Sequence, residues 1–167
     1  MRLLRATLTL LALASLLGGC GFQLRGEADL PPEMALTQMV VEDPYSTLPR
    51  RVQTLLEQNG VQFVNASRAT AVLEIPVNEV VTQVLTIGDN ARVQEYRVSH
   101  TVQFRLLDAG GAELLSMQNL RQSRDVSFDE QKILATSREM EYLRDDLAEG
   151  LARLLVSRLE SVTAGSP

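Results

Sequence analysis

Three residue types are almost missing from this chain of 167 residues, which contains one cysteine, one histidine and a single lysine. A lone cysteine excludes an internal disulfide and a cysteine-rich metal site. A lone histidine excludes chemistry built on paired imidazoles. The sequence also lacks the Gly-x-Ser-x-Gly elbow of hydrolases and a glycine-rich phosphate loop. We therefore expect no catalytic site, no metal and no cofactor, and we predict that the protein is not an enzyme.

Positive charge is scarce as well, since 16 lysines and arginines face 21 acidic residues. If residues 1–19 are removed as a leader, Arg2 and Arg5 go with them, and the formal balance becomes 14 against 21, or −7. Proteins that bind nucleic acid usually carry a basic surface, so nucleic acid is not an expected partner. Apolar residues make up 45% of the chain, which is enough to form the core of one domain.

The first 19 residues carry no charge after Arg5, and the run from Leu8 to Leu17 is almost wholly apolar. A basic start, a short apolar run and then small residues are typical of a secretory signal peptide. The run is shorter than the roughly 20 residues that span a bilayer. We predict that residues 1–19 are cleaved off. The alternative, a retained and buried N-terminal helix, is less favoured because charge, length and small residues all fit export.

The only cysteine, Cys20, follows this segment directly. The residues "LGGC" (17–20) resemble the bacterial lipobox, in which cleavage precedes a cysteine that then carries a diacylglycerol and an N-acyl chain. This resemblance implies that Cys20 is a lipid anchor. Each buried methylene contributes about 0.8 kcal/mol, and stable anchoring needs more than one chain. Gly21 stands where an aspartate would resemble the inner-membrane retention signal, so the expected location is the outer membrane.

The rest of the chain predicts a strand, a helix, three strands and a helix. The expected elements are a strand at 35–43, a helix from about Pro49 to Gly60, strands at 69–87, 92–108 and 112–128, and a last helix ending near Ser161. Hairpin turns are expected at 88–90 and 109–111. Pro76 predicts a bend or an edge position. A helix follows the first strand, so this strand is free to pair in parallel with a later one.

Residues 92–108 alternate between an apolar and a polar face, as in a half-buried antiparallel strand. Tyr96, Val98, Val102, Phe104 and Leu106 form the apolar face, and Arg97, Ser99, Thr101, Gln103 and Arg105 form the other. His100 falls on the apolar face with no carboxylate beside it. A buried or edge histidine with satisfied hydrogen bonds is therefore favoured over a base or a ligand.

The last helix carries an apolar stripe of Met140, Leu143, Leu147, Leu151, Leu154 and Leu155. Thr136 and Glu139 have the spacing of a capping box at its start. A one-faced sheet must bury its apolar side, and two amphipathic helices can cover it. We expect an α+β two-layer sandwich, with two helices packed on a roughly four-stranded, mostly antiparallel sheet. The expected divisions are a signal peptide (1–19), a lipidated N-terminus and tether (20–34), one domain (35–161) and a flexible C-terminus (162–167).

A few basic residues are candidates for binding an anion. Lys132 lies between the last strand and the last helix, Arg92 lies beside the 88–90 turn, and Arg121 and Arg124 lie near the end of the last strand. Lysine and arginine match phosphate groups well. From spacing alone, ordinary surface charge is the favoured interpretation, because single exposed charges contribute little.

Four segments of the chain resemble the lipopolysaccharide-assembly lipoprotein family LptE. They are "GCGFQLRG" at the lipidation site, "PRRVQTLLEQNGV" in the first helix, "QEYRV" at 94–98 and "LAEGLARLL" in the last helix. Their order and spacing over residues 19–160 carry the resemblance, rather than any single motif. The family fold, two helices on a four-stranded sheet, agrees with the elements predicted above.

The resemblance implies an outer-membrane lipoprotein on the periplasmic side, which plugs and helps to assemble the LptD β-barrel. It implies a part in lipopolysaccharide transport to the cell surface, with lipopolysaccharide as a ligand. Lys132 matches a basic position before the last helix that the family uses for this ligand, and Arg92 approximates a second one. A general lipid-binding or transporter-accessory lipoprotein is the alternative. Co-purification with a large barrel distinguishes the two.

Overall fold

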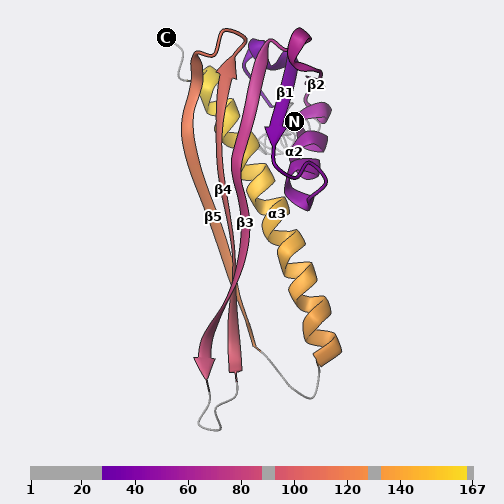
Figure 1. Ribbon diagram of the computed structural model, residues 1–167, viewed down its shortest axis with the longest axis vertical. Coiled ribbons are helices and arrows are strands. Elements are labelled where there is room, and N and C mark those ends of the chain that lie inside the picture. Colours follow the sequence, from indigo (N-terminus) through magenta and orange to yellow (C-terminus); the bar gives the residue numbers. More distant parts are fainter. Residues whose placement is uncertain (1–27, 88–92, 128–132, 165–167) are drawn as a thin grey trace, which may run out of the picture.

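The computed structural model describes residues 28–87, 93–127 and 133–164. They form a five-stranded sheet with the order β2-β1-β3-β4-β5, and two α-helices cover one of its faces (Figure 1). This confirms the predicted α+β two-layer class. The elements are η1 (Pro32–Ala35), β1 (Leu36–Val41), α2 (Thr47–Gln58), β2 (Gln62–Phe63), η2 (Ala66–Arg68), β3 (Ala71–Ile87), β4 (Val93–Asp108), β5 (Glu113–Ser127) and α3 (Ile133–Ala164).

The first strand, β1, lies inside the sheet and pairs in parallel on both sides. Thr37 is opposite Ala71 of β3, and Leu36 is opposite Gln62 of β2. Parallel strands need a crossover connection, and α2 provides it. The predicted parallel pairing of the first strand is confirmed. The fifth strand, β2, was not predicted, because its two residues form a strand only by pairing with β1.

β3, β4 and β5 form a long antiparallel meander. The register of β3 shifts between Glu74 and Val77, and the partner strand β1 ends opposite Ile75. The bend predicted at Pro76 is thus confirmed. The turn predicted at 109–111 is confirmed too, since Oδ1 of Asp108 accepts 2.8 Å hydrogen bonds from the main chain of Gly110 and Ala112. The turn at 88–90 lies outside the described residues.

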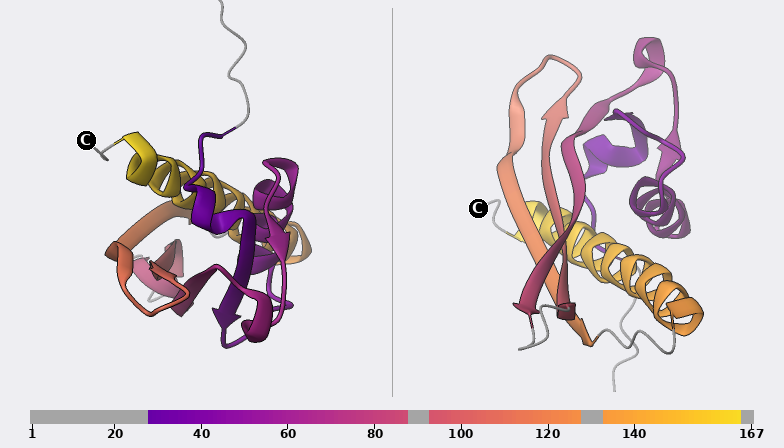
Figure 2. Two further views of the ribbon diagram at one scale, coloured as in Figure 1. Left: turned by 90° about the horizontal axis from the view of Figure 1, so that it is seen from above. Right: turned by 60° about the horizontal axis from the view of Figure 1, so that its bottom comes forward.

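The hydrophobic core lies between the two helices and the helix-facing side of the sheet (Figure 2). Val98, Val102, Phe104 and Leu106 are fully buried, which confirms the predicted alternation of β4. The helices contribute fully or almost fully buried side chains to the core: Leu48, Val52 and Leu56 in α2, and Leu147, Ala148, Leu151, Ala152, Leu155 and Leu159 in α3. The two helices also pack against each other, so burial of aliphatic side chains holds the layers together.

The expected tether needs correction in its described part. Residues 28–34 are fixed to the domain, because Met34 is fully buried in the core and its carbonyl accepts a hydrogen bond from Oγ1 of Thr37 (2.7 Å). The main-chain nitrogen of Ala28 also donates to Oδ1 of Asn59 at 2.6 Å. Turn-forming residues such as Pro31 and Pro32 here open a short 3-10 helix instead of a free linker.

Three expectations for the last helix, its start, its end and the burial of Leu154, were also wrong. α3 begins at Ile133, so the capping-box spacing does not mark its start, and it continues to Ala164. No glycine or proline interrupts the residues from Ile133 to Thr136. Leu154 is 43% exposed, because the buried stripe follows positions 147, 151, 155 and 159 together with 148, 152 and 156. Among the described residues, no helix has the length and the uninterrupted apolar run needed to cross a bilayer.

Candidate functional site

The face of the sheet that points away from the helices lies outside the hydrophobic core. None of the described helices covers it (Figure 2). Cross-strand partners share a face in an antiparallel pair, so the register places the polar residues of three strands side by side here. They are Glu74, Glu79 and Gln83 of β3, Arg97, Ser99, Thr101, Gln103 and Arg105 of β4, and Asn119, Arg121, Ser123 and Asp125 of β5. We call this surface the open face.

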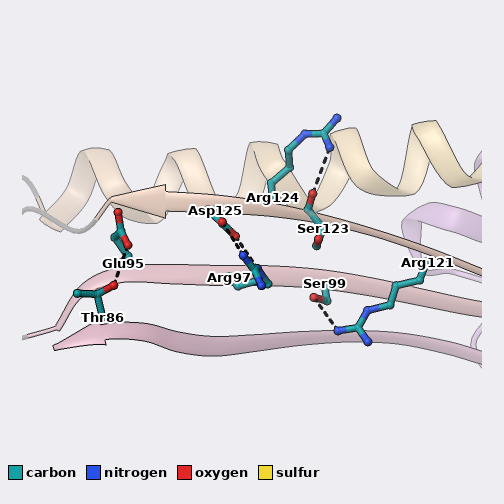
Figure 3. Close-up of polar contacts among 8 residues, drawn as sticks. All are labelled: Thr86, Glu95, Arg97, Ser99, Arg121, Ser123, Arg124 and Asp125. Carbon is teal, nitrogen blue, oxygen red and sulfur yellow. Dashed lines mark hydrogen bonds and ion pairs between the residues drawn. The ribbon is translucent and has the colours of Figure 1, made fainter.

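One end of the open face carries an ion pair with two parallel hydrogen bonds. Nε and Nη2 of Arg97 donate to the two carboxylate oxygens of Asp125 at 2.7 and 2.8 Å (Figure 3). This bidentate geometry is the strongest form of such a contact. The hydrogen bonds from Arg97 hold the pKa of the Asp125 carboxyl below its ordinary value. Both side chains are exposed, so water screens the pair and it contributes little to folding stability.

The other end of the open face carries a three-residue charge cluster. Nε of Arg105 lies 2.6 Å from Oε2 of Glu74 on β3, and its Nη1 lies 3.7 Å from Oε1 of Glu113 on β5. Between the two clusters, Nη2 of Arg121 donates to Oγ of Ser99 at 3.2 Å. Figure 3 shows Arg121 reaching from β5 toward the central strand. The arginine guanidinium lies over Ser99, which is buried although it belongs to the open face.

This arrangement is suited to binding rather than to catalysis. Most of the charges on the open face are already paired across strands, which lowers the cost of taking them out of water against another polar surface. Within the described residues there is no group of three metal-ligating side chains. These residues form a broad, polar surface on three paired strands.

A hydrogen-bonded chain links the opposite, helix-facing side of β4 to the start of α2. His100 is buried, and its Nε2 donates to Oδ1 of Asn78 at 2.7 Å. Nδ2 of Asn78 then donates to Oγ of Ser46, the residue before α2, at 3.0 Å. Nδ1 of His100 is buried and has no hydrogen-bond partner in the part of the chain that the structure describes. This confirms the expectation of a buried histidine with a hydrogen-bond partner, and burial lowers the pKa of His100.

The three predicted site residues, Cys20, Arg92 and Lys132, lie outside the described residues. The described strands nevertheless fix where two of their segments attach. Arg92 belongs to the connection between β3 and β4, and Lys132 to the connection between β5 and α3. Glu95 is paired with both Thr86 and Ser127, so both connections leave the sheet at the same end. Thr86 and Glu95 are also joined there by a 2.8 Å hydrogen bond (Figure 3).

The acidic partners of the open face were not predicted from the sequence. Asp125 lies 28 residues from Arg97, and Glu74 lies 31 residues from Arg105. Only the strand register brings these residues together, and alternation alone does not determine the register. Arg124 is on the helix-facing side, where its Nη2 lies 4.0 Å from Oδ2 of Asp146 in α3. It therefore does not share the surface of Arg121, although both were named from the same strand.

Known proteins share this arrangement of sheet and helices. The chain is 26% identical to an uncharacterized lipoprotein B from Nitrosomonas europaea, with a TM-score of 0.72 over 87% of this chain and 94% of that one. A rare lipoprotein B from Shewanella oneidensis is also 26% identical, with a TM-score of 0.67 over 77% of this chain and 96% of that one.

Sequence relatives carry an explicit family name. An LPS-assembly lipoprotein LptE from Photorhabdus laumondii is 30% identical over 92% of this chain and 84% of its own length. A protein of the same name from Yersinia enterocolitica is 29% identical over 96% of this chain and 78% of its own length. The model of the lipopolysaccharide-assembly family LptE matches residues 36–159, which run from the first residue of β1 to the last buried leucine of α3. The chain therefore belongs to the LptE family of lipopolysaccharide-assembly lipoproteins.

Proposed function

We propose that this protein is anchored in the outer membrane through Cys20 and acts as a plug and assembly partner of the LptD β-barrel. In this role it takes part in the transport of lipopolysaccharide to the cell surface. The family supports this proposal through its name and through the shared fold. The structural observation that carries it is the open face, a polar sheet surface that no described helix covers.

A polar surface of this kind fits the interior of a large barrel. The lumen of outer-membrane barrels is lined by polar side chains, while their outer wall is apolar. A plug must therefore present polar groups toward the wall, and pairing its charges lowers the cost of burying them. The open face pairs most of its charges, through the bidentate contact of Arg97 with Asp125 and the cluster around Arg105.

The lipopolysaccharide contact is proposed at the end of the sheet from which the β3–β4 and β5–α3 connections leave. These connections contain Arg92 and Lys132, and Lys132 is the only lysine of the chain. Two basic residues at one end of a chain with net negative charge form a local site for phosphorylated sugars. The pairing of Glu95 with both Thr86 and Ser127 supports this placement.

Photo-crosslinking in cells tests the barrel partner. We expect benzoyl-phenylalanine at Gln103 and at Asn119, both on the open face, to trap LptD when the full-length chain is expressed. A probe at the exposed Arg158 of α3 shows whether the helix side of the domain also crosslinks to LptD. If probes on the open face and on the helix side all fail to trap LptD, the plug proposal is wrong. The general lipid-carrier alternative then becomes the better reading.

Charge reversal tests the lipopolysaccharide contact. The double variant Lys132→Glu, Arg92→Glu should weaken binding of lipopolysaccharide to the chain lacking residues 1–20, and the difference should shrink at high salt. A charge-assisted hydrogen bond is worth about 1.5 to 3 kcal/mol, or about tenfold to a hundredfold in affinity for each lost contact. The matched control is Arg50→Glu with Arg68→Glu, which makes the same charge change at exposed positions elsewhere. Equal weakening by both double variants would contradict a specific site.

A further inference from the structure

The second half of β3 is an edge strand. Pairing between β1 and β3 ends with Val41 opposite Ile75, and from Val77 to Ile87 β3 is paired with β4 only. Its other edge meets no strand of the described chain. Figure 1 shows β3, β4 and β5 continuing past β1 and α2, with β3 on the outside of this extension. A row of main-chain N–H and C=O groups is therefore available for a further strand.

Both faces of this edge are uncovered as well. Every side chain from Glu79 to Leu85 is exposed, although Val98, Ser99 and His100 on the neighbouring β4 are buried. The large apolar side chains exposed in this stretch are Val80, Val81, Val84 and Leu85. Exposed aliphatic side chains on both sides of an unpaired edge are typical of a surface that another chain covers.

The opposite edge of the sheet is different. Natural proteins protect free edges with charged residues, prolines or bulges. β5 carries Glu113, Arg121, Arg124 and Asp125, and α3 packs along it. In β3, Glu79 is the only charged residue from Val77 to Ile87, and a register shift appears only near Thr86. The stretch from Val80 to Leu85 thus lacks the protection found on β5.

The occupant of this edge has to be a polypeptide. A lipid surface can cover valine side chains, but it does not satisfy a row of main-chain hydrogen-bonding groups. A second copy of the chain is disfavoured by electrostatics, since the mature chain carries a formal charge of −7 and net charge keeps copies apart. Glu79 has no ion pair among the described residues, so an occupant with a basic side chain near this position is favoured.

We propose that residues 79–85 of β3 accept an extended segment of the barrel partner as an added strand. This inference rests on the proposed function and names the surface through which the partner is bound. The strands of a closed barrel wall have all their hydrogen-bonding groups paired, so the segment belongs to a loop or a tail that enters the lumen. Its apolar side chains alternate, and they pack beside Val80 and Val84 on one face and beside Val81 on the other.

Crosslinking with benzoyl-phenylalanine at Val80, Thr82 and Val84 tests the geometry of this contact. The full-length chain is expressed in cells with LptD, and mass spectrometry locates each crosslinked residue. An added strand predicts one contiguous LptD segment, along which the crosslinked position moves steadily from probe 80 to probe 84. Crosslinks scattered over several wall strands, or to another protein, overturn the proposal. Crosslinks to a second copy of the chain overturn it as well.

A matched pair of lysine substitutions tests how much the free edge of β3 contributes to binding of LptD. Val84 is 48% exposed on the free edge of β3, and Met117 is 44% exposed on β5 at the other edge. Val84→Lys should lower the amount of chain that co-purifies with tagged LptD by about tenfold, whereas Met117→Lys should change it less than about twofold. Both variants should keep the unfolding midpoint of the parent, because both side chains are exposed. Equal co-purification of the two variants overturns the proposal.

The probe at Gln103 separates failure of this inference from failure of the proposed function. If Gln103 traps LptD and the edge probes do not, the added strand is wrong and the plug proposal stands. If the probes at Gln103, Asn119 and Arg158 and the edge probes all fail to trap LptD, the proposed function fails and this inference fails with it.

Discussion

From Ala71 to Ile75, β3 lies between β1 and β4 beneath the helices, and Ala71, Leu73 and Ile75 are buried. From Val77 onward the same strand has one neighbour, and Val80, Val81 and Val84 are exposed. Both halves are rich in β-branched and aliphatic residues, so composition does not distinguish them. What differs is the number of layers and strands around them. The near half (Ala71–Ile75) packs in the core and stabilises the domain, and the far half (Val77–Ile87) carries similar side chains that are exposed from position 79 to position 85.

The largest effect is expected from truncating one residue in each half of this strand. Leu73→Ala should lower the free energy of unfolding by about 2 to 5 kcal/mol, because it removes a fully buried side chain from the core. Val84→Ala should cost less than about 1 kcal/mol, because Val84 is exposed. Denaturant unfolding of the chain starting at residue 21 measures both. Similar losses would show that the far half is packed as tightly as the near half.

A smaller effect is expected at His100, which is buried on β4 opposite Val80 of the far half. Burial lowers the pKa of His100 below 6.5 in the folded chain. Below pH 6.5 the unfolded chain therefore takes up a proton that the folded chain does not, and stability falls as the pH decreases. The loss is at most about 1.4 kcal/mol for each pH unit, and well above pH 6.5 this group contributes no pH dependence.

Unfolding at about pH 7.5 and about pH 5.5 measures this slope. His100→Gln is the control, because glutamine does not titrate and still offers a hydrogen-bond donor to Asn78. The slope should be smaller in this variant. The pKa of Asp125 is lowered from 3.8, so Asp125 titrates below the pH range of this experiment and does not contribute to the measured slope. An unchanged slope in His100→Gln would mean that other groups cause the pH dependence.

The smallest effect is expected where α3 contacts Gln122, the register partner of His100. A Cβ atom at Gly150 would lie 2.6 Å from Oε1 of Gln122, so the glutamine side chain has to move when Gly150 becomes alanine. In a Gln122→Ala background, Gly150→Ala should stabilise the chain by about 1 kcal/mol through helix propensity. In the parent background the gain should be clearly smaller. Equal gains in the two backgrounds would show that this contact does not limit how closely α3 approaches β5.

Local sequence patterns predicted most of the core-forming faces of the domain. Alternation in residues 96–106 and the spacing of leucines in α3 identified the buried faces, because these periodicities reflect the geometry of a single element. The boundaries of helices and strands were less predictable. β2 exists only through its pairing with β1, and α3 starts before the apparent capping box because helix-compatible residues precede it. Met34 is buried through contacts with residues distant in sequence, which no local pattern encodes.

The candidate site was predicted only in part, for a related reason. The polar side of β4 followed from alternation, and Arg97, Gln103 and Arg105 were identified correctly as its members. Their acidic partners Glu74 and Asp125 depend on the register between strands. Cys20 stood out as the lone cysteine after a signal-peptide pattern, and Arg92 and Lys132 as basic residues beside expected turns; the family resemblance implied their roles, and all three lie outside the described residues.

The hydrogen bond between Ala28 and Asn59 has a consequence for how far the domain can travel. It fixes the chain to the end of α2 at a point only eight residues after Cys20. With a lipid at Cys20, as proposed, even a fully extended connection reaches about 28 Å. The domain would then stay within a thin layer next to the membrane. A short linker of this kind gives an effective concentration in the millimolar range. A weak contact is then sufficient for binding to a membrane-embedded partner, because the linker keeps the domain close to it instead of letting it diffuse through the periplasm.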